Sequence, residues 1–183
     1  MPQYIAFLRA INVGGRNIKM DKLRGHFEDM GFENVESFIA SGNIIFETER
    51  VDRRALEQPI EAHLEEALGY EVATFVRTVE EVGEIAGYTP FVKAMLERDG
   101  SNLYVGFVAE PPDNKAVERL HGHATEIDSF HVNGREVYWL CNTSSSQSDF
   151  SGAKLERALG RPATMRNIRT VRRLAKKYGD RNV

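Results

Sequence analysis

The chain has 183 residues, of which 42% are hydrophobic and 28% charged, and its formal net charge of −3 completes a composition typical of a globular protein. No apolar run approaches the ~20 residues of a membrane span, the first residues show no export signal, and the single cysteine, Cys141, excludes an internal disulfide. These features favour a cytoplasmic protein with no membrane partner.

The first 77 residues predict the order β-α-β-β-α-β. Strands are expected at Gln3–Leu8, Val35–Ala40, Ile44–Thr48 and Val72–Arg77, and helices at Met20–Met30 and Asp52–Leu68. Ser41-Gly42-Asn43 predicts a tight hairpin between the second and third strands. Pro59 predicts a kink or a late start in the second helix, because proline lacks a backbone donor. This order is that of the split βαβ, or ferredoxin-like plait.

Residues 78–100 read as a connection with helical character, which opens on the capping-box pattern Thr78-Val-Glu-Glu81. The β-α-β-β-α-β pattern then repeats. Its strands are expected at Leu103–Ala109, Glu126–Val132, Glu136–Cys141 and Ala163–Met165, with helices ending at Gly122 and Gly160 and a last amphipathic helix over Ile168–Tyr178. Asn133-Gly134 predicts a two-residue hairpin.

Glycine spacing supports an internal duplication. The helix-ending glycines are 38 residues apart in each half, Gly31 to Gly69 and Gly122 to Gly160, and the hairpin glycines Gly42 and Gly134 are 92 apart. We therefore predict an α+β protein with two tandem ferredoxin-like (split β-α-β, α-β plait) domains and a C-terminal basic helix. The predicted domains are 1–77 and 101–183, the second including that helix, with 78–100 as the helical connection.

The topology brings two polar segments together. Strands one and two of a split βαβ run parallel, so the loop Asn12–Asn17 should lie beside Ser41-Gly42-Asn43. Exposed amides and guanidinium groups in such a place favour anions. The candidate ligand-binding residues here are Arg9, Asn12, Gly14, Gly15, Arg16, Ser41 and Asn43. A structural interpretation stands beside this one: glycine serves turn geometry, asparagine bonds its own backbone, and Arg9 forms an ion pair.

The C-terminal segment is strongly basic. Residues 161–183 hold eight Lys and Arg residues against Asp180 alone: Arg161, Arg166, Arg169, Arg172, Arg173, Lys176, Lys177 and Arg181. Such a face is either simply solvated or suited to a nucleic-acid backbone, an anionic small molecule or an acidic surface of the same protein.

Known catalytic and cofactor motifs do not fit this chain. Gly14-Gly15 lacks the spacing of a P-loop or a dinucleotide-binding fingerprint. Neither His121-Gly-His123 nor His63-Leu-Glu-Glu is a metal motif, and no partner base marks Cys141 as a nucleophile. We therefore expect no metal and no cofactor, and whether the protein is an enzyme stays open.

Three segments resemble the bacterial DUF1697 family, a domain of unknown function. They are Tyr4-Ile-Ala-Phe-Leu-Arg-Ala-Ile-Asn-Val-Gly-Gly15, then Ser41-Gly-Asn43, then Thr164-Met-Arg-Asn167 with Thr170 and Leu174. The resemblance implies tandem α-β plaits and no established activity, and Ala10 stands where the family usually has glycine. It adds Thr164, Arg166 and Asn167 to the candidate site, which we expect to meet the first loop in a three-part polar junction.

Three functions follow from these residues. The first is a binding module for an anionic ligand, a nucleotide or a nucleic-acid phosphate. The second is a small-molecule enzyme that uses the same cluster for electrostatic orientation. The third is a structural or oligomeric interaction protein, in which the cluster locks two domains and a homo-oligomer is left open. Arg9→Ala separates the last from the others, since only a lock predicts a sharp fall in melting temperature.

Overall fold

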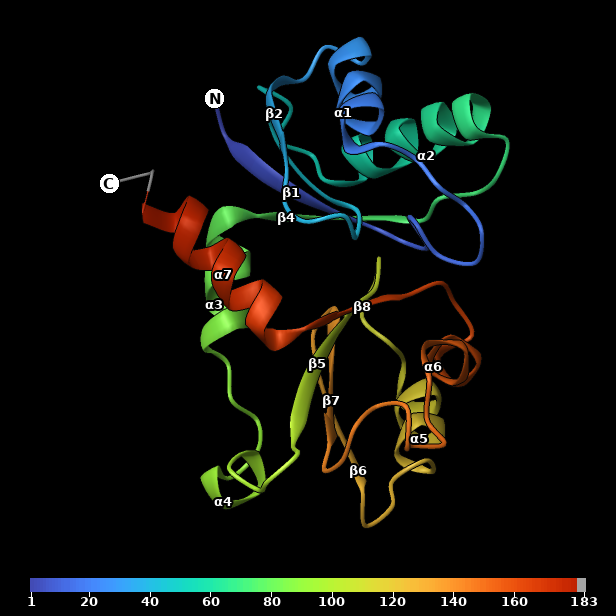
Figure 1. Ribbon diagram of the computed structural model, residues 1–183, viewed down its shortest axis with the longest axis vertical. Helices are drawn as coiled ribbons and strands as arrows, with labels where there is room; N and C mark the ends of the chain where they lie inside the picture. Colours follow the sequence, from blue (N-terminus) through green and yellow to red (C-terminus); the bar gives the residue numbers. More distant parts are fainter. Residues whose placement is uncertain (181–183) are drawn as a thin grey trace. The chain divides into compact units, whose positions relative to one another are not determined.

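The computed structural model describes residues 1–180 and shows a mixed α+β protein with two four-stranded antiparallel sheets and seven helices (Figure 1). Contacts divide the chain into two compact units: the first unit is Met1–Glu84 with the stretch from Leu174 onward, and the second unit is Ile85–Arg173. Among residues 1–180, no helix combines the length and apolar character that crossing a membrane requires.

The first unit is built on a sheet with the strand order β2-β3-β1-β4. Its elements are β1 Gln3–Leu8, α1 Met20–Asp29, β2 Glu33–Ser37, β3 Asn43–Glu47, α2 Arg54–Leu68, β4 Thr74–Thr78 and the start of α3 Val79–Gly87. Alternate residues of β1, Tyr4 and Ala6 among them, share one core with Phe27 of α1 and Ile60 of α2. Both helices therefore cover the same face of this sheet.

The second unit repeats this plan with the strand order β6-β7-β5-β8. Its elements are α4 Lys93–Leu96, β5 Asn102–Phe107, α5 Asn114–His121, β6 Asp128–Asn133, β7 Glu136–Cys141, α6 Gly152–Leu159, β8 Thr164–Asn167 and the start of α7 Ile168–Gly179. Leu120 of α5 and Leu155 of α6 share a core with Val137 and Trp139 of β7. The two helices again lie on one face.

Side chains in equivalent places extend the glycine evidence for duplication. Arg77 pairs in register with Ile5, and Arg166 pairs with Val105, so both arginines occupy the same place in the fourth strand of their sheets. Both are buried. In each arginine, Nη1 donates a hydrogen bond to the carbonyl oxygen of the residue before it, at 2.9 Å in both cases.

A second pair of equivalent contacts involves Tyr178, near the end of α7, and Tyr88, directly after α3. Tyr178 Oη donates to Glu36 Oε2 at 2.9 Å in the first unit. Tyr88 Oη lies 2.8 Å from His131 Nε2 in the second unit. Glu36 and His131 hold the same register position on their edge strands, opposite Ile45 and Tyr138.

Local sequence signals predicted several junctions correctly. Glu81 N donates to Thr78 Oγ1 at 3.0 Å while Thr78 N donates to Glu81 Oε2 at 2.8 Å, so the predicted capping box is present. The segment predicted at 163–165 is the edge strand β8. Gly69 and Gly160 end their helices with φ of 78° and 67°.

Three local predictions were wrong. Helix α2 begins at Arg54 and runs through Pro59, so the late start, one of the two alternatives predicted at Pro59, does not occur. Both Pro59 and Ala55, the residue whose carbonyl loses its donor, are exposed, so water can satisfy that carbonyl. The second hairpin turns at Gly134 and Arg135, one residue later than expected, with φ of 59° at Gly134.

The first hairpin is the third case. Strand β2 ends at Ser37 and β3 begins at Asn43, so residues 38–42 form a longer connection than the predicted three-residue turn. Ile39 has φ of 52° and Gly42 has φ of 75°, so the chain reverses its direction through two residues in the left-handed conformation.

Candidate functional site

The two polar segments of the first unit meet as predicted. Asn12 Nδ2 donates to Ala40 O at 3.1 Å, which ties the β1–α1 loop to the β2–β3 connection. Leu8 N donates to Gly42 O at 2.8 Å. A Cβ on Gly42 would lie 3.0 Å from Ile11 Cβ, so glycine is needed for this close approach. The loop and the connection therefore form one packed corner.

The asparagines of this corner hold backbone groups. Asn12 has φ of 57°, and its Oδ1 accepts from Ile18 N at 2.8 Å. Asn43 is fully buried, and its Nδ2 donates to Phe38 O at 3.1 Å and to Ser41 Oγ at 2.9 Å. These contacts fit the structural interpretation of both side chains, since each closes a loop on itself.

Gly14 and Gly15 form the exposed tip of the β1–α1 loop. Their φ values are 62° and 83°, and Arg16 N donates to Val13 O at 3.2 Å across them, as in a type I′ turn. Within residues 1–180, the amides of Gly14 and Gly15 donate to no acceptor. The Arg16 guanidinium lies over the Tyr70 ring, 4.3 Å from its centroid. The tip thus presents two amides beside an oriented cation.

Arg9 follows β1 directly and is half-buried. Its backbone amide donates to Ala73 O at 2.9 Å, which fixes the chain where it leaves the sheet. The residue therefore begins the loop from a fixed backbone position.

The third predicted segment lies on β8 in the second unit. Arg166 Nη1 donates to Thr164 Oγ1 at 2.7 Å, and burial lowers the pKa of Arg166 to about 10. Asn167 Oδ1 accepts from Arg169 N at 2.9 Å at the start of α7. The candidate residues are therefore divided between the two units, and the three-part junction stays a prediction.

Asn167 also lines a polar cavity of about 200 Å³ in the second unit. We call it the arginine cavity; its lining residues are Leu96, Ser101, Asn102, Leu103, Leu140, Asn167, Ile168, Arg169 and Arg172. Two cations but no Asp or Glu line it. Arg172 Nε donates to Ala86 O at 3.4 Å, whereas within residues 1–180 the Arg169 guanidinium has no acceptor.

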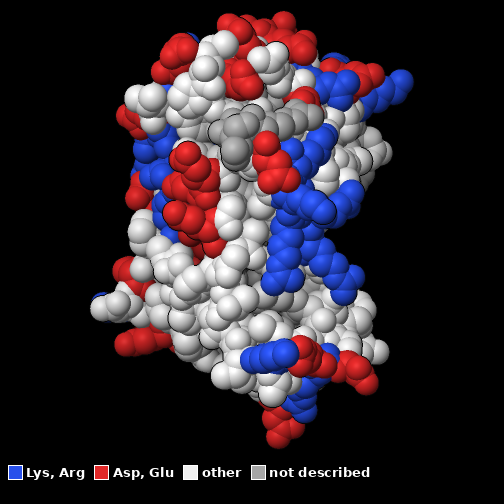
Figure 2. All heavy atoms as spheres, turned by 90° about the vertical axis from the view of Figure 1, so that its left-hand side faces the viewer, with Lys and Arg blue, Asp and Glu red and all other residues white. Residues whose placement is uncertain are grey.

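Sequence reasoning identified these arginines only as members of a basic helix face. Arg169, Arg172, Arg173, Lys176 and Lys177 are all exposed along α7, and Figure 2 shows Lys and Arg side chains gathered on this face. Lys177 Nζ lies 3.3 Å from Glu36 Oε2 and 5.8 Å from the centre of the Phe38 ring. Hydrogen bonds with Tyr178 and Glu36 raise the pKa of Lys177. Arg181, which was counted with this face, lies outside the described residues.

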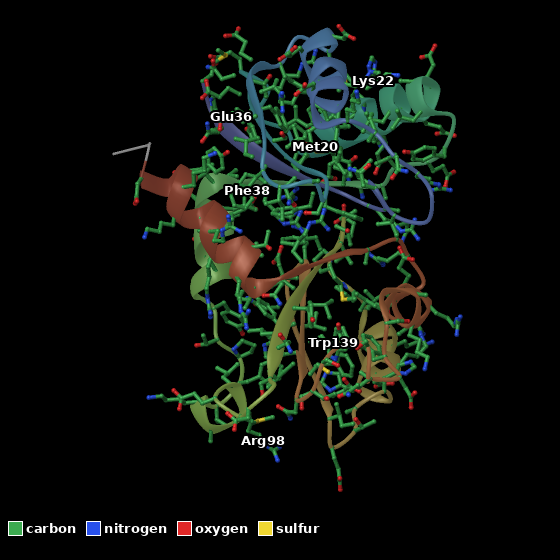
Figure 3. The ribbon with its side chains drawn as sticks, viewed as in Figure 1. Met20, Lys22, Glu36, Phe38, Arg98 and Trp139 are labelled. Atoms are coloured by element: carbon green, nitrogen blue, oxygen red, sulfur yellow. The ribbon has the colours of Figure 1, made fainter. Side chains whose placement is uncertain are left out.

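A second cavity, of about 320 Å³, is lined by aromatic rings of the second unit. Trp139, labelled in Figure 3, is one of these rings. Tyr104 and Trp139 stack with ring centroids 4.9 Å apart, and Phe150 meets Trp139 edge-on. Trp139 Nε1 donates to the buried Asp128 carboxylate at 2.8 Å. Trp139 lies on β7 and is buried in the core of the second unit.

The structure is that of an α+β protein with two units, in which the same strand order occurs twice. Polar loops lie at the ends of strands in the first unit. The chain belongs to the family described as "Protein of unknown function (DUF1697)", which matches residues 1–138. The family predicted from the three segments is therefore confirmed.

Among solved structures, the chain is similar to the conserved bacterial protein SP0830 from Streptococcus pneumoniae. The two share 22% sequence identity with a TM-score of 0.78, over 98% of this chain and 99% of that one. At this identity the likeness concerns the fold alone. No curated protein matches the sequence.

Proposed function

We propose that this protein binds an anionic ligand bearing a phosphate or carboxylate group, and that the arginine cavity holds it. One observation carries the proposal: Arg169 and Arg172 line a single cavity that has no acidic residue in its lining. The two lie three residues apart on α7, where like charges destabilise a helix by ~0.2–0.5 kcal/mol. A bound anion would remove that repulsion, and guanidinium groups match carboxylate and phosphate bidentately.

The size and the remaining polar groups of the cavity support a small anion. About 200 Å³ lies below the ~300–1,000 Å³ usual for drug-sized ligands. Within residues 1–180, the Asn167 amide nitrogen donates to no acceptor, so it is available to the same anion. Of the residues that the sequence singled out for ligand binding, Asn167 is the one that lines this cavity.

The tip of the β1–α1 loop is a second location for the same function. Exposed backbone amides next to left-handed residues favour anions, and Gly14, Gly15 and Arg16 supply such groups in the first unit. The full junction of Arg9, Asn12, Ser41 and Asn43 with Thr164 and Arg166 belongs to this alternative.

We further propose that the two predicted domains, residues 1–77 and residues 101–183, are each built on a ferredoxin-like plait. The element order β-α-β-β-α-β and the strand order 2-3-1-4 within each sheet support this assignment.

The proposal is tested by titrating inorganic phosphate and pyrophosphate into the full chain by calorimetry at constant ionic strength. Arg169→Ala should weaken binding about 10-fold or more, as expected when a charge-assisted contact is lost. Lys176→Ala is the matched control, because Lys176 is an exposed cation on the same helix outside the cavity. Equal losses in both variants would indicate diffuse attraction, and a loss confined to Arg16→Ala would move the site to the loop.

Nucleic acid is a second candidate ligand, supported by the row of exposed cations on α7. If phosphates dominate such binding, the affinity for a polynucleotide falls steeply with salt, with a logarithmic slope of about −0.9 per contacted phosphate on duplex DNA. Binding that is absent at low salt, or that is independent of salt, would refute this candidate.

A further inference from the structure

Two histidines from different helices face each other in the first unit. His26 lies on α1 and His63 on α2, with ring centroids 5.5 Å apart. Asp29 follows His26 by three residues, so both side chains lie on one face of α1. The three side chains each offer one ligand atom, and these atoms all lie within 4.8 Å of one another.

The ring nitrogens of this pair are unsatisfied. Within residues 1–180, His26 Nε2 and His63 Nε2 are both buried and have no hydrogen-bond partner. A buried polar atom without a partner is uncommon in native proteins and calls for an explanation. A shared ligand between the two rings would satisfy both nitrogens at once.

We propose that His26, His63 and Asp29 form a binding site for a divalent transition metal ion of the zinc class. Two imidazole nitrogens and one carboxylate suit Zn²⁺, whereas Mg²⁺ and Ca²⁺ prefer oxygen ligands. Tetrahedral ligands at ~2.0–2.1 Å from zinc lie about 3.4 Å apart. The observed ligand atoms lie up to 4.8 Å apart, so binding would require side-chain rotation, for which the exposed Asp29 has room.

Such a metal would join α1 to α2 and would leave one coordination position open to water. Local sequence patterns did not indicate this site, because the ligands come from two helices and the two histidines are 37 residues apart. The site shares no residue with the arginine cavity, so the metal proposal is tested independently of anion binding.

The test uses the full chain, treated with EDTA, dialysed into a phosphate-free buffer and titrated with ZnCl₂ by calorimetry and thermal melting. We expect about one Zn²⁺ per chain and a rise in Tm of several degrees, as for any ligand that binds only the folded state. His26→Ala and His63→Ala should abolish both effects, and Asp29→Asn should weaken binding about 10-fold. MgCl₂ should have no effect.

His121→Ala is the matched control, because His121 is an exposed histidine at the end of a different helix. It should bind Zn²⁺ as the wild type does. If the alanine variants fail to fold by circular dichroism, His26→Gln and His63→Gln replace them. An absent Zn²⁺ response in the wild type, or an unchanged response in folded His26 and His63 variants, overturns the proposal.

Discussion

Gly42→Ala should destabilise the first unit markedly, because glycine serves two purposes at this position. Its φ of 75° is a left-handed conformation that other residues adopt only with strain. A Cβ there would also lie 3.0 Å from Ile11 Cβ and 3.1 Å from Leu8 Cβ. Both neighbours are buried core residues next to the sheet, so neither can move away without disturbing the corner.

The magnitude follows from these two terms. The left-handed backbone costs about 1–2 kcal/mol for a residue with a Cβ, and overpacking a well-packed core costs about 1–3 kcal/mol. The expected loss in the free energy of unfolding is therefore about 2–5 kcal/mol. For a chain of this size, each kcal/mol lowers Tm by ~2–4 °C.

Gly69→Ala separates the two terms. Gly69 has φ of 78° but nothing within 4 Å of a Cβ, so its variant reports the backbone cost alone. Urea unfolding of both variants, followed by circular dichroism, should show Gly42→Ala less stable than Gly69→Ala by about 1–3 kcal/mol. Equal stability of the two variants would refute the claim that the loop and the β2–β3 connection are packed together.

Three further outcomes are expected. Asn12→Ala should lower the free energy of unfolding by about 1–3 kcal/mol in urea denaturation, since it removes two hydrogen bonds. The control Asn17→Ala, at an exposed position, should change stability little. Equal losses in the two variants would contradict the conclusion that Asn12 holds the loop in place. Burial raises the pKa of the Cys141 thiol, so iodoacetamide should label native protein far more slowly than unfolded protein; equal rates would contradict this. Burial and the neighbouring His63 lower the pKa of His26 in the folded protein. As the pH falls below about 6.5, the His26 imidazole is therefore protonated in the unfolded chain before it is protonated in the folded one, and metal-free protein should lose stability. In thermal melts across this pH range, His26→Gln should reduce the pH dependence of Tm, and an unchanged dependence would contradict the prediction.

Topology predicted the corner of the first unit better than side-chain chemistry did. The parallel arrangement of β1 and β2 was enough to place the loop near Gly42, and the hydrogen bond from Asn12 to Ala40 confirms it. The Thr78–Glu81 capping box was also predictable, because all its contacts lie within four residues. Turn positions were less certain, since a one-residue shift at Gly134 changes no burial pattern in the flanking strands.

The candidate sites needed information that local patterns do not contain. The arginine cavity joins Arg169 to Asn102, and the histidine pair joins α1 to α2, so each depends on the register of distant elements. The equivalence of Arg77 and Arg166 could not be predicted from the sequence. It is defined by strand register, because Arg77 pairs with Ile5 and Arg166 pairs with Val105.

Calorimetric titration of pyrophosphate into the wild type, Arg169→Ala and Lys176→Ala at one ionic strength tests the central claim most directly. The arginine cavity predicts saturable binding that is about 10-fold weaker or more in Arg169→Ala and nearly unchanged in Lys176→Ala. No saturable binding in the wild type, or the same weakening in both variants, would contradict a specific anion site in this cavity.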